Sequence, residues 1–501
     1  MPALDHRRAP LVEALARYQQ HGTIPFSTPG HKLGVGADPE IVERLGSAAF
    51  SADIPLGGGI DDSHFRGDTL GQAEALGADA WGAERSFYLV NGSSAGNQAF
   101  LLATIQPGDE VVIARDIHKS LLVALILTGA RPIYIAPRLH DTLQVGLGLD
   151  AVDVAAALDA HPAARLVVLV SPSYCGVASD LAAIATVAHE RGALLFVDEA
   201  WAPHIQFHPA LPRSAMQSGA DGAVASVHKM LAGLTQASVL HLQGPRVDIA
   251  RVATAVGMVQ TTSPSATILA SIDAARRQMA LDGERLLERT IALAERARRL
   301  LNALPGVSVL SADRLGIDPC RFDPTKLVID VHELGLSGFA AEHALRDRFA
   351  IQPEMSDLVG VACLITIGDT EHSIDRLTTA FTRLSAERPG PAGGSHLRST
   401  GSAIAPGEQA LSPREAFFAP SRAVPLADTV GQVSAELVIP YPPGIPVLAP
   451  GDIISGEKIE YLQHGVSLGM YLSGPADPRL ATLRIVDDGA TSRDDRGDAR
   501  H

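Results

Sequence analysis

Lys229 lies in the segment SVHKML (226–231) and has the setting of a covalent nucleophile. The apolar stretch GAVASV leads into it and a glycine-containing turn follows, so its amine would point into a site rather than along a solvated helix face. Partial desolvation lowers the pKa of such an amine and makes it a better nucleophile. Ser226 is placed to bind an anion nearby. Taken alone, the pattern SxHK is a weak signal.

A small-residue turn, NGSSAGNQA (91–99), follows an apolar run and opens a helical pattern. Small residues let the backbone approach an anion, and a helix N-terminus offers free N–H groups. Ser93 and Ser94 add two hydroxyls, which makes the turn a candidate phosphate site. The alternative interpretation is an ordinary Ser/Gly turn with a capping serine.

Asp198 and His118 each follow an apolar run, in LLFVDEAW (194–201) and RDIHKS (115–120). A carboxylate at the end of a buried strand needs a cationic or hydrogen-bonding partner. The pyridinium nitrogen of pyridoxal 5′-phosphate (PLP) would be such a partner, and the ion pair would let the ring withdraw electrons from a substrate Cα. His118 could lie flat over a cofactor ring or transfer protons. Asp198 could instead be an N-cap or metal ligand, and His118 a surface or capping residue.

The elements that must position these residues alternate between strands and helices. Helical patterns occupy 97–105, 118–129 and 181–192, and they separate apolar strand-like runs: RSFYLV directly before Asn91, EVVIAR, RPIYIA, ARLVVLVS and ALLFVDEA. This alternation predicts an α/β fold with a parallel sheet covered on both faces. Ligands of such sheets bind beyond the carboxyl ends of the strands, where all four segments lie. Together they predict a PLP enzyme in which Lys229 carries the cofactor as a Schiff base.

The chain of 501 residues is expected to hold several units. A long amphipathic helix (271–304) follows the strand–helix alternation, and a Gly/Pro/Ser-rich stretch begins near residue 387. We expect an N-terminal arm and interface segment (1–70), a large PLP-binding domain (71–270), a smaller α/β domain (271–386), a flexible linker (387–411), a C-terminal segment (412–485) and a disordered tail (486–501).

The formal charge of −15 argues against nucleic-acid and anionic-membrane partners and mildly favours a cationic substrate. Cys175, Cys320 and Cys363 form no CxxC pair, so we expect no metal site or disulfide scaffold and a reducing compartment. The N-terminus has no apolar signal core, and no apolar run is long enough to span a bilayer. A soluble, cytoplasmic protein is expected.

Many further motifs follow the same order as in the Orn/Lys/Arg decarboxylase family, which this chain resembles from about residue 20 to 465. The resemblance implies the PLP-dependent aspartate-aminotransferase fold (fold type I), in the short form without an N-terminal wing. It rests on the segments above and on TPGHKLG (28–34), DDSHFRG (61–67), LTGARPIYI (127–135), SPSYCGVASDL (171–181), QTTSPSATILASIDAAR (260–276), QPEMSD (352–357), SPREAFFAP (412–420) and SAELVIPYPPGIPVLAPGD (434–452).

The resemblance also implies a role for each residue around the cofactor. Many relatives carry histidine where this chain has Trp201, which sets that position apart. The implied cofactor-binding residues are Ser93, Ser94, the Ala95 backbone, Ser226 and His228 at the phosphate, His118 and Ala200 on the two ring faces, Asp198 at the ring nitrogen, Trp201 near the ring substituents, and Lys229 as the Schiff-base lysine.

The implied reaction is decarboxylation of arginine, lysine or ornithine to the amine, with arginine favoured for a short form and with a part in polyamine biosynthesis. Lys229 or His228 would return the proton to Cα. Carboxylates must bind the distal cation of the substrate. The candidates are Asp61, Asp62, Glu354, Asp357 and Glu436, each of which could equally be an ordinary surface or capping acid.

Family members build each site across a dimer interface, so we expect a homodimer or a higher homo-oligomer. TPGHKLG, the 61–67 loop and the pair Thr261/Thr262 are the segments expected to act in trans. An alternative is an aminotransferase or another lyase of the same fold. A transaminase needs an arginine for the substrate carboxylate, and Arg321 is available. An inactive homologue that serves as a binding subunit is a further alternative, but it would be expected to lack Lys229 or Asp198.

Overall fold

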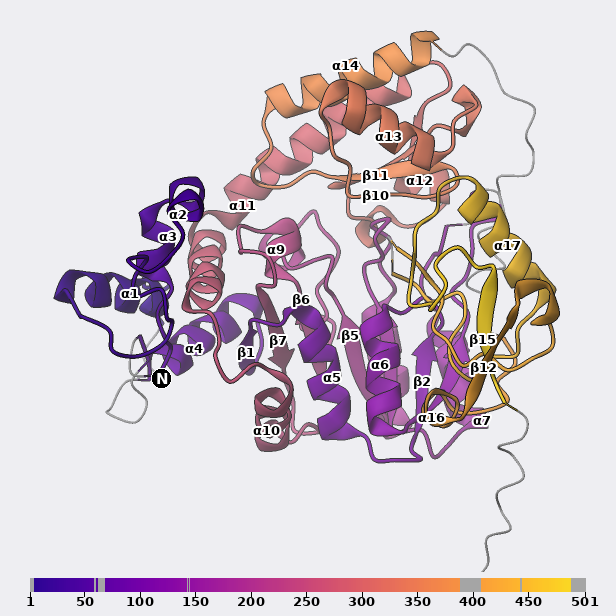
Figure 1. The fold of residues 1–501 in the computed structure, drawn as a ribbon, viewed down its shortest axis with the longest axis horizontal. Coiled ribbons are helices and arrows are strands. Elements are labelled where there is room, and N and C mark those ends of the chain that lie inside the picture. The colour runs from indigo at the N-terminus through magenta and orange to yellow at the C-terminus, as the bar shows by residue number, and fades with distance from the viewer. Residues whose placement is uncertain are drawn as a thin grey trace, which may run out of the picture.

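The structure is a computed structural model that describes residues 4–57, 60–61, 68–141, 143, 145–387, 407–441 and 444–487. An N-terminal arm holds α1 (Pro10–His21), α2 (Pro39–Leu45) and α3 (Ser47–Ala52). The arm projects from one side of the molecule, and the C-terminal unit lies on the opposite side (Figure 1).

The large domain is built on a seven-stranded sheet in the order β1-β7-β6-β5-β4-β2-β3. All neighbouring pairs are parallel except those of β7, which runs antiparallel to both β1 and β6. The strands are β1 (Arg85–Leu89), β2 (Glu110–Ala114), β3 (Arg131–Ile135), β4 (Leu166–Val170), β5 (Leu194–Asp198), β6 (Gly222–Ala225) and β7 (Ser238–Leu242).

The predicted α/β class with a mainly parallel sheet is confirmed, and β7 is the strand that departs from the parallel direction. The connection from β6 to β7 contains only the four-residue helix α9 (Val227–Met230). Neighbouring parallel strands are usually joined by a crossover with a full helix, which this connection lacks, and β7 returns antiparallel. The reversal leaves Lys229 on the short connection at the carboxyl end of β6.

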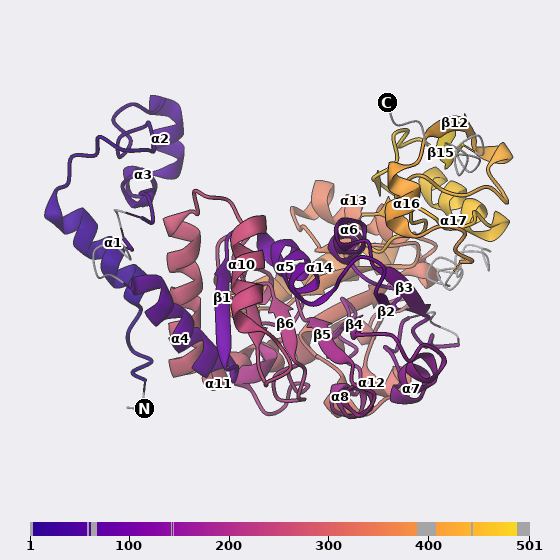
Figure 2. The ribbon, with the colours of Figure 1, turned by 90° about the horizontal axis from the view of Figure 1, so that it is seen from below.

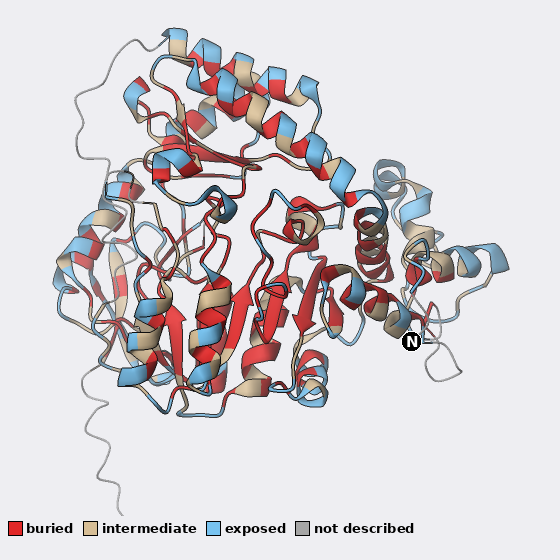
Figure 3. Cartoon of the chain, turned by 180° about the vertical axis from the view of Figure 1, so that it is seen from behind, coloured by how far each residue is buried: buried red, intermediate tan, exposed pale blue. Residues whose placement is uncertain are grey.

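Helices cover both faces of this sheet, with α5 and α6 on one side and α7 and α8 on the other (Figure 2). Apart from the edge strand β3, the strands between them are almost entirely buried (Figure 3), which explains their continuous apolar sequences. The helices of the large domain are α4 (Thr69–Trp81), α5 (Gly92–Thr104), α6 (Lys119–Thr128), α7 (Ala151–Ala160), α8 (Leu181–Glu190) and α10 (Ile249–Val259).

The long helix α11 (Ala266–Asn302) joins the large domain to the smaller one. Ser265 caps it by accepting the N–H of Ile268, and it runs without a break across the expected boundary at 270/271. Its first half packs in the core with α1 and β1, and its second half packs in the core of the four-stranded sheet. That sheet has the order β10-β11-β9-β8. The remaining elements of the smaller domain are β8 (Ser308–Val309), α12 (Ala312–Leu315), β9 (Lys326–Asp330), α13 (Gly338–Phe349), β10 (Met355–Ser356), β11 (Gly360–Leu364) and α14 (Glu371–Glu387).

The C-terminal unit is anchored to the large domain by the buried side chain of Arg115, directly after β2. Its guanidinium donates to the carbonyls of Pro446 and Val447 and to Asp452 Oδ2, the last over 2.9 Å. Lys458 Nζ lies 3.6 Å from the same carboxylate oxygen. The unit contains α16 (Pro413–Phe418), β12 (Ser421–Pro425), β13 (Ile439–Pro440), α17 (Gly456–Ser467), β14 (Leu472–Ser473) and β15 (Thr482–Val486).

Most of the expected linker, and the tail beyond residue 487, lie outside the described residues. Val486, where the tail was expected to begin, instead ends β15 and pairs with Ser421. None of the helices in the described ranges is long and apolar enough to cross a bilayer.

Candidate active site

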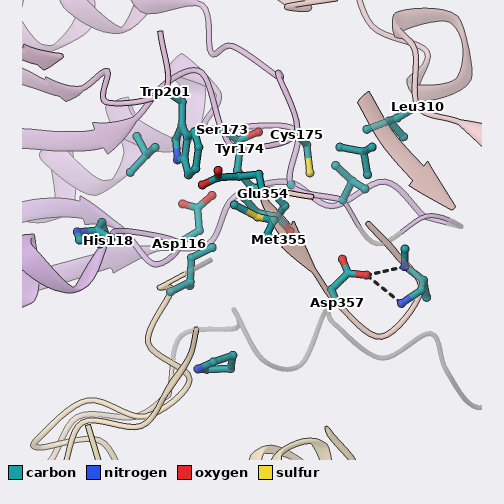
Figure 4. A pocket seen from close by; sticks show the side chains of 18 of the residues that line it. Asp116, His118, Ser173, Tyr174, Cys175, Trp201, Leu310, Glu354, Met355 and Asp357 are labelled. Carbon is teal, nitrogen blue, oxygen red and sulfur yellow. Dashed lines mark hydrogen bonds between the residues drawn. The ribbon is translucent and has the colours of Figure 1, made fainter. Parts of the chain in front are cut away.

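A cavity of about 320 Å³ opens at the carboxyl ends of the parallel strands, between the large domain, the smaller domain and the C-terminal unit. Asp198 ends β5, and Lys229 lies on the connection after β6. Side chains from the other two units complete the wall. The smaller domain supplies Glu354 and Met355, which face the large-domain side chains His118, Asp116 and Trp201 (Figure 4).

Asp198 is buried and held at both carboxylate oxygens. Its Oδ2 accepts from Asn97 Nδ2 over 2.8 Å, and its Oδ1 accepts from the backbone N–H of Ala200 over 3.1 Å. Asn97 also donates to Ser120 Oγ, which in turn lies 2.8 Å from His118 Nδ1. A continuous polar chain therefore fixes both the carboxylate and the imidazole.

The imidazole of His118 sits in a desolvated part of this wall. Burial lowers the pKa of His118 to about 4, although the charge of Asp198 opposes the shift. At neutral pH the ring is therefore uncharged. His118 also caps α6 by accepting the N–H of Ser120, so the capping alternative holds alongside its position in the cavity.

The amine of Lys229 points into the cavity and lies 3.5 Å from the centroid of the Trp201 ring. Burial lowers the pKa of Lys229 to about 8, and the carboxylates of Asp198 and Glu354 limit the shift. The amine can therefore be neutral or protonated within the physiological range, as a nucleophile that also transfers protons requires.

The predicted phosphate turn opens α5. Gly92 has φ +72°, a conformation that L side chains rarely adopt, and Ser93 beside it lines the cavity. Ser226 Oγ is fully buried and has no hydrogen-bond partner in the part of the chain that the structure describes. Buried hydroxyls are nearly always bonded, so the hydrogen-bonding requirement of this one is unmet within the described residues. His228 lies nearby in sequence, and its Nδ1 donates to the Ala237 carbonyl over 2.8 Å.

Two of the carboxylate candidates line the cavity, with different surroundings. The carboxylate of Glu354 has no hydrogen-bond or ion-pair partner among the described residues, and burial raises its pKa. Asp357 instead accepts the N–H groups of Val359 and Gly360, each over 2.8 Å (Figure 4), so its carboxylate also caps a turn.

The remaining candidates lie elsewhere. Asp61 accepts the N–H of Thr69, and Glu436 accepts those of Ala476 and Arg484; neither lines the cavity of its own chain. Asp62 is outside the described residues. Arg321, available for a substrate carboxylate on the aminotransferase alternative, donates to the backbone carbonyls of Ala178 and Leu147.

Comparison with known proteins places this site in a family. Residues 9–317 match the major domain of the Orn/Lys/Arg decarboxylases, and residues 402–472 match their C-terminal domain. The chain belongs to the Orn/Lys/Arg decarboxylase family. It is therefore a decarboxylase, as the sequence predicted.

Relatives match over nearly the whole chain. An arginine decarboxylase of Halalkalibacterium halodurans is 38% identical over 96% of this chain and 98% of its own length. One of Bacillus subtilis is 37% identical over 96% and 99%. The crystal structure of a lysine decarboxylase from Francisella novicida has a TM-score of 0.80 at 22% identity, covering 96% of this chain and 81% of the other, which shows the shared fold.

Several residues of this decarboxylase site were missed by sequence reasoning. Asn97 and Asp116 lie inside motifs that were recognised, NGSSAGNQA and RDIHKS, but nothing in those patterns indicates which way their side chains point. Asp116 also lines the cavity. Within the described ranges no other side chain is hydrogen-bonded to its carboxylate, and burial raises its pKa to about 6. Arg314, on α12, also lines the cavity.

Glu199, directly after Asp198, should make stability depend on pH. It is buried, its Oε1 accepts the Ala215 N–H, and burial raises its pKa to about 8. In the unfolded chain a glutamate ionises near pH ~4.3. Between those values the unfolded state releases a proton that the folded state keeps, so rising pH destabilises the wild type and not Glu199→Gln.

We therefore expect the free energy of unfolding of Glu199→Gln, minus that of the wild type, to increase as pH rises towards about 8 and then to level off. The slope is at most ~1.4 kcal/mol per pH unit. Urea unfolding at a series of pH values measures it. Glu190→Gln, at an exposed site on α8, serves as the control. A difference that is constant across the range would contradict the assignment of a neutral Glu199.

Proposed function

We propose that this protein is a PLP-dependent decarboxylase that converts arginine to its amine and CO2. The proposal rests on the observation that Asp198 and Lys229 line the same cavity. Asn97 donates a hydrogen bond to the carboxylate of Asp198, and burial lowers the pKa of the Lys229 amine. One PLP molecule would offer a pyridine nitrogen to Asp198 and an aldehyde to the amine of Lys229.

The residues present fit that cofactor. Asp198 would pair with the ring nitrogen, and the unpartnered Ser226 hydroxyl would bind the phosphate. When bound, PLP supplies an electron-withdrawing ring that accepts the electron pair left by departing CO2. The other residues that we assign to it are Ser93, Ser94, the Ala95 backbone and His228 at the phosphate, His118 and Ala200 on the two faces, and Trp201 near the substituents.

The side chains of this chain would then control which bond breaks and where protons go. The hydrogen-bond network Asp198–Asn97–Ser120–His118 would hold the Asp198 carboxylate and the His118 imidazole in place before the substrate binds, so that little reorganisation is needed. Lys229 can carry a proton near neutral pH and is positioned to return it to Cα. His228 is the second candidate, because its Nε2 remains available while Nδ1 donates to Ala237.

The cationic substrate is proposed from charge and from relatives. The carboxylates of Glu354 and Asp116 lie in the cavity wall, and neither has a side-chain partner among the described residues. A guanidinium would satisfy such groups by charge-assisted hydrogen bonds. The relatives that match over nearly their full length, from H. halodurans and B. subtilis, are arginine decarboxylases, which favours arginine over lysine or ornithine.

A product screen tests the proposed function. The purified enzyme with PLP is incubated separately with arginine, lysine and ornithine, and CO2, amine and keto acid are measured. We expect CO2 and amine in equal amounts from arginine, at a higher kcat/KM than from the other two. Keto acid without CO2 would favour the aminotransferase alternative. Faster turnover of lysine or ornithine would overturn the arginine assignment alone.

Ser226→Ala tests the phosphate site. Losing a hydrogen bond to a charged group costs ~1.5 kcal/mol, so the Kd for PLP should rise about tenfold. The Kd for pyridoxal, which has no phosphate, should not change. Because the hydroxyl is unpartnered in the structure, the variant without PLP should be no less stable than the wild type. An equal loss for both ligands would contradict the assignment.

Glu354→Gln tests the distal carboxylate. We expect the KM for arginine to rise about 10- to 100-fold, the effect of losing a charge-assisted hydrogen bond of ~1.5–3 kcal/mol. Because burial raises the pKa of Glu354, the wild-type KM should fall as pH rises through that pKa, and this limb should vanish in the variant. Asp357→Asn is the matched control, since its carboxylate caps a turn. A KM that changes equally in both variants would contradict the role of Glu354.

We also propose a cytoplasmic homodimer with shared active sites. The N-terminal arm exposes the apolar side chains of Ile24, Phe26 and Val35 at 79%, 97% and 90%, which favours this arm as an interaction surface. The TPGHKLG segment of this arm and the exposed Thr261/Thr262 pair do not line the cavity of their own chain, so a second copy could receive them. Light scattering that gives the mass of one chain would contradict the dimer.

A further inference from the structure

Trp201 holds the free amine of Lys229 on the face of its indole ring. The Nζ-to-centroid distance of 3.5 Å is well inside the range of a cation–π contact, which attracts an ammonium and not a neutral amine. Trp201 is half-buried, with its ring on the cavity wall (Figure 4). Its position therefore decides where the Lys229 ammonium can rest.

The backbone of Trp201 is fixed from the smaller domain. Lys326, the first residue of β9, donates from Nζ to the Trp201 carbonyl over 2.9 Å. This lysine is 1% exposed, so it has lost nearly all its contact with water. Burying an ammonium is costly, and such groups persist where their partners are fixed. Lys326 is thus a rigid support for the loop after β5.

A second attachment lies three residues further along the same loop. His204 Nε2 is 3.2 Å from Asp323 Oδ2, and Lys326 Nζ is 3.4 Å from the same oxygen. Asp323 Oδ1 accepts from Thr325 Oγ1 over 2.6 Å. Burial alone would raise the pKa of Asp323, but Lys326 and His204 outweigh it and hold that pKa well below the usual range. The segment 323–326 therefore contacts the loop 201–204 at both ends, through the Trp201 carbonyl and the His204 side chain.

We propose that the buried cluster of Lys326, Asp323 and His204 is a positioning device that holds the Trp201 indole against Lys229, so that the amine is docked as an ammonium whenever it is not bonded to the cofactor. This inference rests on the proposed function. Docking keeps a proton donor at a defined place in the cavity and keeps the free amine from drifting out of reach.

The charges around Lys229 agree with this role. Asp198 and Glu354 favour the ammonium, whereas burial and the charge of Lys326 disfavour it. His118, on the loop after β2, is uncharged near neutral pH because burial lowers its pKa to about 4. The Trp201 face adds to the groups that favour the charged form. Removing it should lower the pKa of Lys229 from its value of about 8.

The first experiment measures that pKa in the full chain. PLP is added at a series of pH values, and the rate of covalent attachment to Lys229, which requires the neutral amine, gives a midpoint. We expect Trp201→Leu to lower the midpoint by about 0.5 to 1 pH unit, and Trp201→Phe by less, because phenyl keeps part of the cation–π attraction. Midpoints that match the wild type in both variants would overturn the docking role.

The second experiment measures the positioning without any cofactor. The chain has two tryptophans, so Trp81→Phe leaves Trp201 as the sole fluorophore. Because Trp81 Nε1 donates to the carbonyl of Pro203 in the same loop, the Trp81→Phe chain, and not the wild type, is the reference for every variant. In that background, Lys326→Met should increase the acrylamide quenching of Trp201. Lys458→Met is the matched control, because Lys458 is also a buried lysine beside an aspartate but lies in the C-terminal unit. It should leave the quenching unchanged.

Thr325→Val is the milder variant if Lys326→Met does not fold. It removes one hydroxyl from Asp323 and should increase quenching less, in the same direction. Unchanged quenching in both variants, or an equal increase in the Lys458 control, would overturn the positioning role. A chain that binds no PLP would refute the proposed function instead, and the quenching experiment would still test the positioning device.

Discussion

The rest of the site depends on a single buried negative charge at the end of β5. Asp198 leaves the sheet where water is excluded, and its carboxylate must be compensated. The protein provides an amide donor from Asn97 and a backbone N–H from Ala200, which are hydrogen bonds without a formal charge. A positive partner among the described residues is Lys229, whose ammonium form is favoured by the charge of Asp198. This requirement explains why the strand ends, the loop after β6 and the polar chain through Ser120 converge on one cavity.

Two buried ionic clusters hold the other units against that cavity. Arg115 binds Asp452 and two backbone carbonyls of the C-terminal unit, which places Ile445 and Val447 in the cavity wall. Lys326 binds the carbonyl of Trp201 from the smaller domain. Both cations are almost fully buried, and removing one partner of such a pair costs ~3–5 kcal/mol. The unit interfaces are thus specified by directional contacts as well as by apolar packing.

The sequence was informative wherever the chemistry is local. Apolar runs located the strands, and the position of Asp198 at the end of one and of Lys229 just after another followed from pattern alone. The helix N-terminus at Gly92 was visible in the same way. Which of the five candidate acids line the cavity was not predictable, because such acids look alike in sequence. Glu354 and Asp357 reached the cavity, while Glu436 turned to backbone N–H groups of its own unit.

Long-range contacts account for the rest of what sequence reasoning missed. Lys326 is separated from Trp201 by 125 positions, and no local pattern indicates that its amine reaches that carbonyl. The reversal of β7 was also hidden, since an apolar strand reads the same in either direction. In the sequence, Lys326 begins the apolar run KLVIDV (326–331), and nothing in that run indicates that its amine is buried against the loop after β5.

The central claim is that Lys229 is the residue to which PLP is covalently attached. Borohydride reduction of the PLP-loaded enzyme, followed by peptide mass spectrometry, tests it directly. The account predicts the reduced pyridoxyl group on Lys229, with none on the buried Lys326 and none anywhere in Lys229→Ala. A label on another lysine, or a purified chain that takes up no reducible cofactor, would contradict it.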